Sequence, residues 1–312
     1  MSRQLLIALG GGTSAVLSIA FMAGSPMMLV FANLAPLPLF FVGLGIGPAG
    51  AVVAGVVGLI ISGAFGGLVG AGLYGLVHAL PTWLAVRQAL LKRVAPDGTV
   101  VWYSIGAVLS WLTALAAAML IMATLTSYQH GQGLEQAVTA YLDQVMLAIM
   151  PNVGISDREM FVATLTPLFP STAGISWIAV VVGNGLFAQA VLSRSGRNIR
   201  PSPTIKDFTL PDWMSWLLVA CAAMALLGSG DLEYIGRNLA AIMAVPFFVL
   251  GAVVVHALAR RTPSPKVLLV AFYLVLFVSG WARVAIAGLG LIEQWVGVRQ
   301  RVAALQPLQE DE

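Results

Sequence analysis

Residues 100–125 read VVWYSIGAVLSWLTALAAAMLIMATL, a run of 26 residues without one charged side chain. A helix needs about 20 apolar residues to cross the roughly 30 Å hydrocarbon core of a bilayer. This run therefore predicts a membrane-spanning helix, because backbone groups in lipid must be satisfied within the helix itself.

Similar apolar runs fill the rest of the chain and predict nine spans, with eight or ten as alternatives. The nine runs are residues 5–24, 26–47, 48–63, 65–86, 100–125, 171–192, 213–227, 238–258 and 267–291. Only 9% of residues are charged and 59% are hydrophobic, whereas soluble domains carry about 25% charged residues. The composition excludes a soluble enzyme, a soluble nucleic-acid binder and a disordered protein. We expect an all-α, polytopic transmembrane helical bundle.

The second run contains signs of interruption, and the third and fourth runs are poorly separated. Pro36 and Pro38 lie inside the second run, and prolines two residues apart should break or kink a helix. A broken helix at membrane depth is tolerated only where protein or a cavity surrounds it. Only a tight glycine turn separates the third run from the fourth.

The loop charges predict the orientation. Eleven of the 16 Lys and Arg residues fall on one side of the nine-span topology, with only three of the 13 acidic residues. These cations are Arg3, Arg87, Lys92, Arg93, Arg194, Arg197, Arg200, Lys206, Arg260, Arg261 and Lys266. The positive-inside rule makes this side cytoplasmic, together with the N-terminus. The pI of about 9.2 is then explained by the membrane topology. We expect the lipid bilayer as a partner and do not expect nucleic acid.

The stretch 126–170 falls outside under this topology. Its apolar residues recur at helical spacing from Leu134 to Ile149, and Ser156 with Glu159 resembles a capping box that opens a second helix. These external amphipathic helices either cover the bundle or form a lid over a pocket. We divide the chain into an N-terminal bundle, 1–193, which includes this stretch, and C-terminal helices with an interfacial tail, 194–312.

Glycine is concentrated near the N-terminus, with 16 of 33 glycines in residues 1–75. Three pairs four residues apart allow helix backbones to approach closely. These pairs are Gly43 with Gly47, Gly63 with Gly67, and Gly66 with Gly70. They serve either packing within one bundle or an interface that closes around a ligand or a partner helix.

The chain has no visible catalytic centre. No Asp or Glu falls in the middle of a span, and no hydrolase or metalloprotease motif is present. We expect no enzyme activity, no cofactor and no metal. The candidate ligand-binding residues are Asn33, which precedes the two prolines, Asn184 within a span, and Arg283, the one strong charge inside a predicted span.

Several short segments of the C-terminal half resemble the YybS-like family of predicted bacterial inner-membrane proteins. The matching segments are FTLPDW at 208–213, YIGRNL at 234–239, Phe247-Phe248 with Gly251, and LGLIEQW at 289–295. The resemblance implies a bacterial inner-membrane protein whose domain has no assigned function. Leu250 stands where the family often has Gln, so a polar role at that position does not carry over.

The N-terminal half is distantly similar to the S components of energy-coupling-factor transporters. The likeness rests on Pro36, Pro38 and the segment Gly47-Pro48-Ala49-Gly50, and it is an analogy of fold. It implies binding of a small molecule from outside and an energy-coupling partner, which would dock on the loops 87–99 and 193–212.

Our leading hypothesis is therefore an integral inner-membrane protein that binds or transports a small molecule. The alternative is a non-transporting scaffold or assembly factor that uses its glycines to hold partner membrane proteins.

Overall fold

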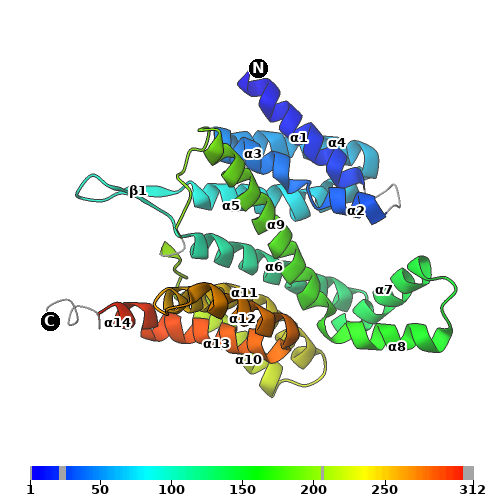
Figure 1. The fold of residues 1–312 in the computed structure, drawn as a ribbon. Helices are drawn as coiled ribbons and strands as arrows, with labels where there is room; N and C mark the ends of the chain where they lie inside the picture. Colours follow the sequence, from blue (N-terminus) through cyan, green and yellow to red (C-terminus); the bar gives the residue numbers. More distant parts are fainter. Residues whose placement is uncertain (1, 21–25, 205–206, 305–312) are drawn as a thin grey trace. The chain divides into compact units, whose positions relative to one another are not determined.

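The computed structural model describes residues 2–20, 26–204 and 207–304 and is 81% helical. Contacts divide the chain into two compact units that interleave in sequence. Unit 1 comprises Met1–Leu112 and Ser176–Asp207, and unit 2 comprises Thr113–Ile175 and Phe208–Glu312. Two long helices, α6 (Ile105–Gln129) and α9 (Phe169–Arg194), belong partly to each unit (Figure 1).

Unit 1 contains the N-terminal helices, a short hairpin and the adjoining parts of α6 and α9. Its elements are α1 (Arg3–Ile19), α2 (Pro26–Ala32), α3 (Pro36–Ile46), α4 (Pro48–Tyr74), a π-helical turn η2 (Gly75–Ala79), α5 (Leu80–Ala89), β1 (Lys92–Val94) and β2 (Val100–Trp102). The break in the second apolar run lies at residues 33–35, and Pro36 begins α3. Proline suits this first turn because its missing N–H has no partner within the helix there.

A glycine turn lies within α4, three residues beyond the boundary expected at residue 64. Gly67 has φ 61° and ψ −159°, which no right-handed helix contains. The two limbs that flank it touch, since a Cβ on Gly63 would lie 3.3 Å from the Cβ of Ala71, and one on Gly70 would lie 2.9 Å from the Ser62 carbonyl oxygen. The segment thus doubles back as a tight helical hairpin.

The all-α expectation needs one correction. Strands β1 and β2 pair antiparallel, with Lys92 opposite Trp102. Gly98 has φ +82° in the connecting turn, and Asp97 accepts hydrogen bonds from the amide and hydroxyl of Thr99. A Pro-Asp-Gly sequence between valines is a recognisable turn signal. Because β2 uses residues 100–102, α6 begins five residues later than the predicted span.

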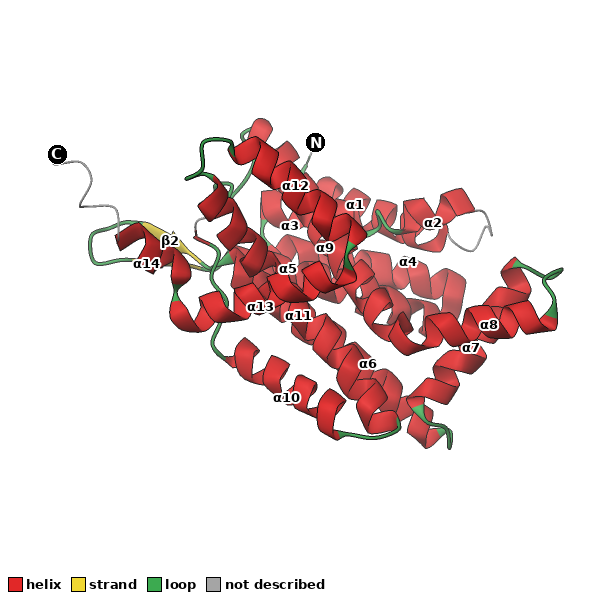
Figure 2. Ribbon diagram, turned by 60° about the horizontal axis from the view of Figure 1, so that its bottom comes forward, coloured by secondary structure: helices red, strands yellow, loops and turns green. Residues whose placement is uncertain are grey.

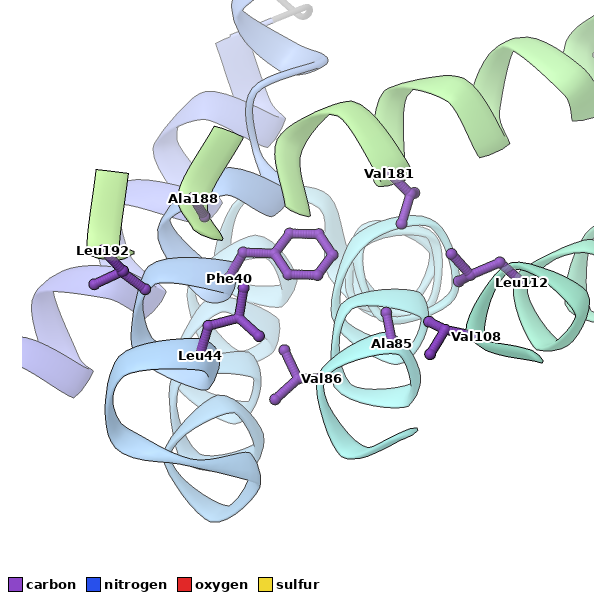
Figure 3. Close-up of a cluster of buried hydrophobic side chains, with 9 residues drawn as sticks. All are labelled: Phe40, Leu44, Ala85, Val86, Val108, Leu112, Val181, Ala188 and Leu192. Carbon is purple, nitrogen blue, oxygen red and sulfur yellow. The ribbon is translucent and has the colours of Figure 1, made fainter. Parts of the chain in front are cut away.

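Nine apolar side chains of α3, α5, α6 and α9 point toward one another and form a core of unit 1 (Figure 3). They are Phe40, Leu44, Ala85, Val86, Val108, Leu112, Val181, Ala188 and Leu192. Gly43 lets α5 approach, since a Cβ there would lie 2.6 Å from Val86 Cγ2. This core fixes α9 against α3 and α5.

Unit 2 consists of helices and connecting loops, with no strand among its described residues (Figure 2). Besides its parts of α6 and α9, it contains α7 (Leu134–Ile149), α8 (Ile155–Leu165), a 3-10 turn η3 (Thr166–Leu168), α10 (Trp213–Leu227), α11 (Asp231–Ala259), α12 (Pro265–Val278), α13 (Gly280–Val296) and α14 (Val298–Ala304). Helix α11 packs on both α10 and α13 at glycines. A Cβ on Gly251 would lie 2.0 Å from the Ile286 oxygen, and one on Gly290 would lie 1.8 Å from the Phe247 oxygen.

Helices α7 and α8 form in the stretch 126–170, as expected, and are joined by an ion pair of 2.7 Å between Arg158 Nε and Asp143 Oδ1. Helix α7 is amphipathic, but α8 is not, because its apolar and polar residues are not separated onto two faces. The predicted capping box is wrong. Gly154 is the N-cap of α8, and Ser156 lies inside the helix without a capping hydrogen bond. Gly154 already supplies the extended backbone that a cap requires, so the helix begins at Ile155.

Among the described residues, four helical segments are long and apolar enough to cross a membrane, or five if a bent pair counts as one span. The expectation of nine spans is therefore not confirmed. Part of the difference lies in Pro48–Ala89, which is one of the four although it doubles back at Gly67. The last predicted span is broken, because α12 and α13 meet at Ser279 with a bend of 119°.

Candidate functional site

A polar cluster surrounds the break between α2 and α3. The break leaves backbone carbonyls without helical partners, and side chains of other helices bind them. Ser14 Oγ on α1 donates to the Ala35 oxygen at 2.6 Å, and the Tyr74 hydroxyl donates to Ser14 Oγ at 2.8 Å. Ser14, Ala35 and Tyr74 are almost completely buried, so these bonds lie in the interior of unit 1.

Asn184 on α9 binds the same break from another side. Its Nδ2 donates to the Asn33 oxygen at 2.9 Å and to the Val180 oxygen at 2.8 Å. Both neighbours are carbonyls that can only accept, so the amide group must face them with its nitrogen. The other end, Oδ1, is buried and has no hydrogen-bond partner among the described residues. Asn184 is 7% exposed, so this acceptor is an exception to the usual pairing of buried polar atoms.

A second polar stripe runs along η2 and α5. Tyr74, His78 and Thr82 follow one another at four-residue spacing, which places them on one helix face. His78 Nδ1 and Thr82 Oγ1 are also buried without a partner within the described parts of the chain. The π-helical turn lies in this stripe, and Trp177 Nε1 of α9 donates to its Val77 oxygen at 3.0 Å. Such turns occur frequently at functional sites.

These groups lie well inside the helices. Ser14 lies eleven residues after Arg3, and Asn184 lies ten residues before Arg194. At about 1.5 Å per residue both are roughly 15 Å from these charged ends, which is about half the hydrocarbon thickness. No carboxylate, Lys or Arg side chain belongs to the cluster, which consists of Ser14, Tyr74, His78, Thr82 and Asn184. The arrangement offers neutral hydrogen-bonding groups at mid-depth.

Of the three predicted ligand-binding residues, two meet in unit 1 and the third lies in unit 2. Asn33 and Asn184 are brought together by a hydrogen bond, with Asn33 contributing its backbone carbonyl. Arg283 lies in unit 2, exposed on the first turn of α13. The predicted span 267–291 that contains Arg283 is bent at Ser279, between α12 and α13.

The six predicted packing glycines fall into two groups, according to whether an added Cβ would touch another residue. A Cβ on Gly43, Gly63 or Gly70 would touch Val86, Ala71 or Ser62 respectively, all within unit 1. A Cβ on Gly47, Gly66 or Gly67 would meet no described atom within 4 Å. Gly47 and Gly67 have positive φ, so they serve turns in the backbone. Among the residues described, no group of three His, Cys, Asp or Glu side chains is arranged to hold a metal ion.

Sequence reasoning missed Ser14, Tyr74 and Thr82 as members of the cluster. The four-residue spacing of Tyr74, His78 and Thr82 was available as a signal. No sequence signal indicated the role of Ser14, because only the packing of α1 against α3 brings this residue to the break.

A family model described as "Predicted membrane protein (DUF2232)" matches residues 13–293. The chain belongs to this family. The match confirms the predicted resemblance to a membrane family without an assigned function. No curated protein and no solved structure matches the chain. The likeness to S components of energy-coupling-factor transporters stays a prediction.

In this DUF2232 protein, three of the four segments that carried the family resemblance meet one another in unit 2, namely 208–213, 247–251 and 289–295. Gln294 Nε2 donates to the Leu210 oxygen at 3.1 Å, and Arg299, which pairs with the buried Glu293 at 2.6 Å, donates to the Phe208 oxygen at 3.0 Å. Gly251 and Gly290 lie at the close crossing of α11 and α13. The recognised segments therefore build the framework of unit 2.

Proposed function

We propose that this protein is a multi-pass protein of a bacterial inner membrane that binds or passes a small, neutral, polar molecule within unit 1. The observation that carries the proposal is the buried and unpartnered Oδ1 of Asn184 beside the broken helix. The protein would have no catalytic centre of its own.

The chemistry of the cluster restricts the ligand. An unmet buried acceptor costs about 1–3 kcal/mol, and a ligand N–H or O–H group would recover this energy. The partnerless atoms of His78 and Thr82 extend the set of groups that a ligand could bind. A charged ligand is disfavoured, because no residue of the cluster offers it a carboxylate, Lys or Arg.

The orientation belongs to the same proposal. Arg3, Arg200 and the ends of α3 and α5 share one end of unit 1, since Arg3 Nη2 donates to the Ile46 oxygen and Arg200 Nη1 to the Ala89 oxygen. The positive-inside rule assigns this end to the cytoplasm. The ligand would then bind about midway through the membrane.

A thermal-stability screen of the detergent-solubilised protein tests the proposal. Benzamide and benzoate have nearly the same shape but differ in charge and in hydrogen-bond donors, and a panel of neutral heterocyclic N–H compounds extends the comparison. We expect neutral donors to raise the unfolding temperature of the wild type but not of Asn184→Leu. Asn152→Leu, which alters an exposed asparagine, is the matched control and should keep the shift. Equal stabilisation by benzoate, or a shift that Asn184→Leu retains, would overturn the proposal.

A second candidate function is a scaffold for partner membrane helices. It is favoured by the tip of the α4 hairpin, where Leu68 is 93% exposed beside Gly66, whose missing Cβ faces open space. Crosslinking from Gly66→Cys to one defined membrane protein, without a ligand effect at Asn184, would favour this function.

A further inference from the structure

Seven described cations gather at one end of unit 1. They come from the starts or ends of α1, α5 and α9, from β1 and from the loop that follows α9, and are Arg3, Arg87, Lys92, Arg93, Arg194, Arg197 and Arg200. Backbone contacts join these segments, since the Ile199 amide donates to the Leu44 oxygen at 3.3 Å and Arg200 donates to the Ala89 oxygen at 2.8 Å. Asp97 and Asp207 are the acids in the same described segments. This end therefore has a strongly positive potential.

Two of these cations share one aromatic ring. Lys92 Nζ lies 5.6 Å and Arg200 Cζ lies 5.8 Å from the centre of the Trp102 ring. Among the described residues, neither cation forms an ion pair with a carboxylate. The ring thus attracts both positive charges, and Arg200 also donates to the Ala89 oxygen.

Arg200 is fixed in place by its surroundings. The residue is 7% exposed, and its carbonyl accepts from Gln189 Nε2 at 2.8 Å and from Asn198 Nδ2 at 2.7 Å. Burial lowers the pKa of the guanidinium, and the charge of Asp207 opposes that shift. An anion at this place would offset the cost of the buried charge.

The surrounding surface is suited to a membrane interface. Val94, Val100 and Val101 of the hairpin are exposed, and Arg87 lies 6.0 Å from the Trp83 ring at the end of α5. Tryptophan, Lys and Arg at the ends of apolar helices are typical of the level where lipid headgroups lie. A soluble partner that bound only the cations would leave the three valines exposed to water.

We propose that this end of unit 1 is a binding site for anionic phospholipid headgroups, with the phosphate held by Lys92 and Arg200 beside Trp102. The valines of β1 and β2 would lie at the boundary between the headgroups and the acyl chains. This proposal does not depend on the ligand site at Asn184.

Native mass spectrometry of the delipidated full-length protein, titrated with phosphatidylglycerol or phosphatidylcholine, tests the site. We expect the wild type to retain phosphatidylglycerol more tightly, with a preference that falls as ionic strength rises. The exposed cations Arg87, Lys92 and Arg93 are changed to Gln together. We expect about fivefold weaker phosphatidylglycerol retention for each removed cation that contacts the lipid.

An equal change of charge elsewhere is the matched control. Arg260→Gln, Arg261→Gln and Lys266→Gln remove three exposed cations from unit 2 and should weaken retention clearly less. Arg200→Lys tests the buried cation while the charge is kept, and it should retain most of the preference. Equal retention of the two lipids by the wild type, or equal losses in the two triple variants, would overturn the proposal. An acidic face of a protein partner would then be the better occupant.

Discussion

Asn184 in unit 1 and Asn238 in unit 2 each bind a place where an apolar helix is interrupted beside prolines, but they do so differently. Asn238 is completely buried and uses both ends of its amide. Its Oδ1 accepts from the Ser171 amide at 2.9 Å, and its Nδ2 donates to the Pro167 oxygen at 3.2 Å and to the Tyr234 oxygen at 2.9 Å. Asn184 uses only its nitrogen, and its oxygen has no partner in the described structure.

The difference separates a structural asparagine from a candidate binding asparagine. At the break in unit 2 the Tyr234 hydroxyl also donates to the Thr166 oxygen at 2.7 Å, so its polar groups are extensively paired. A satisfied buried network makes a structure rigid. The break in unit 1 retains hydrogen-bonding capacity at mid-depth, which a ligand could use.

The largest expected effect is on the paired asparagine. Asn238→Leu removes three hydrogen bonds and leaves the Ser171 amide and the Pro167 carbonyl without this partner. We expect it to lower the free energy of unfolding by about 3 kcal/mol. Denaturant titration in detergent measures the change, with Asn152→Leu as the control. A loss below about 1 kcal/mol would mean that the hydrogen bonds of Asn238 at this break do not stabilise the fold.

The close helix crossing in unit 2 should be nearly as sensitive. Gly290→Ala would place a Cβ 1.8 Å from the Phe247 oxygen and force α11 and α13 apart. We expect a loss of about 2 kcal/mol. Gly288→Ala, two residues away where a Cβ meets no described atom within 4 Å, should change stability little. Similar losses in both variants would contradict the close approach.

Asn184→Leu should cost less than Asn238→Leu when no ligand is bound. The Asn33 carbonyl loses a donor, but the substitution also removes a buried oxygen that had no partner. We expect a net loss of about 1 kcal/mol or less. The same denaturant titration measures it, and a loss as large as that of Asn238→Leu would show that the two asparagines are equivalent.

The smallest effect is expected for the ion pair between α7 and α8. Asp143→Asn weakens the bond to Arg158, but the Asp143 side chain is 44% exposed, so solvent screens the charge. We expect a change of about 0.5 kcal/mol or less. A larger loss in the unfolding free energy would mean that ion pairs, rather than the paired break, stabilise unit 2.

Much of the helical architecture was predictable, because apolar runs and prolines act locally. Pro36 and Pro38 predicted the break before α3. The glycines after residue 60 indicated the hairpin whose turn is at Gly67. The β-hairpin and the bend at Ser279 were missed although Pro96-Asp97-Gly98 and Ser279-Gly280 gave local signals. In both cases the apolar composition of the flanking residues dominated the interpretation.

The candidate site was predictable only in part. Asn184 was identified because an amide within a span needs a partner. That this partner is the Asn33 carbonyl depends on how α9 packs against α3, through contacts such as Phe40 with Gly185. Such contacts join residues more than a hundred positions apart, and no periodicity encodes them. Packing between distant segments also explains why Ser14 was missed, since its partners Ala35 and Tyr74 lie outside α1.

The central claim is that Asn184 retains an acceptor for a ligand. Native mass spectrometry of wild type and Asn184→Leu, each purified gently from membranes and released from detergent in the instrument, tests it most directly. We predict a bound neutral small molecule in the wild type that is lost in Asn184→Leu and retained in Asn152→Leu. A wild type that carries no small molecule, or a molecule that Asn184→Leu holds equally well, would contradict the account.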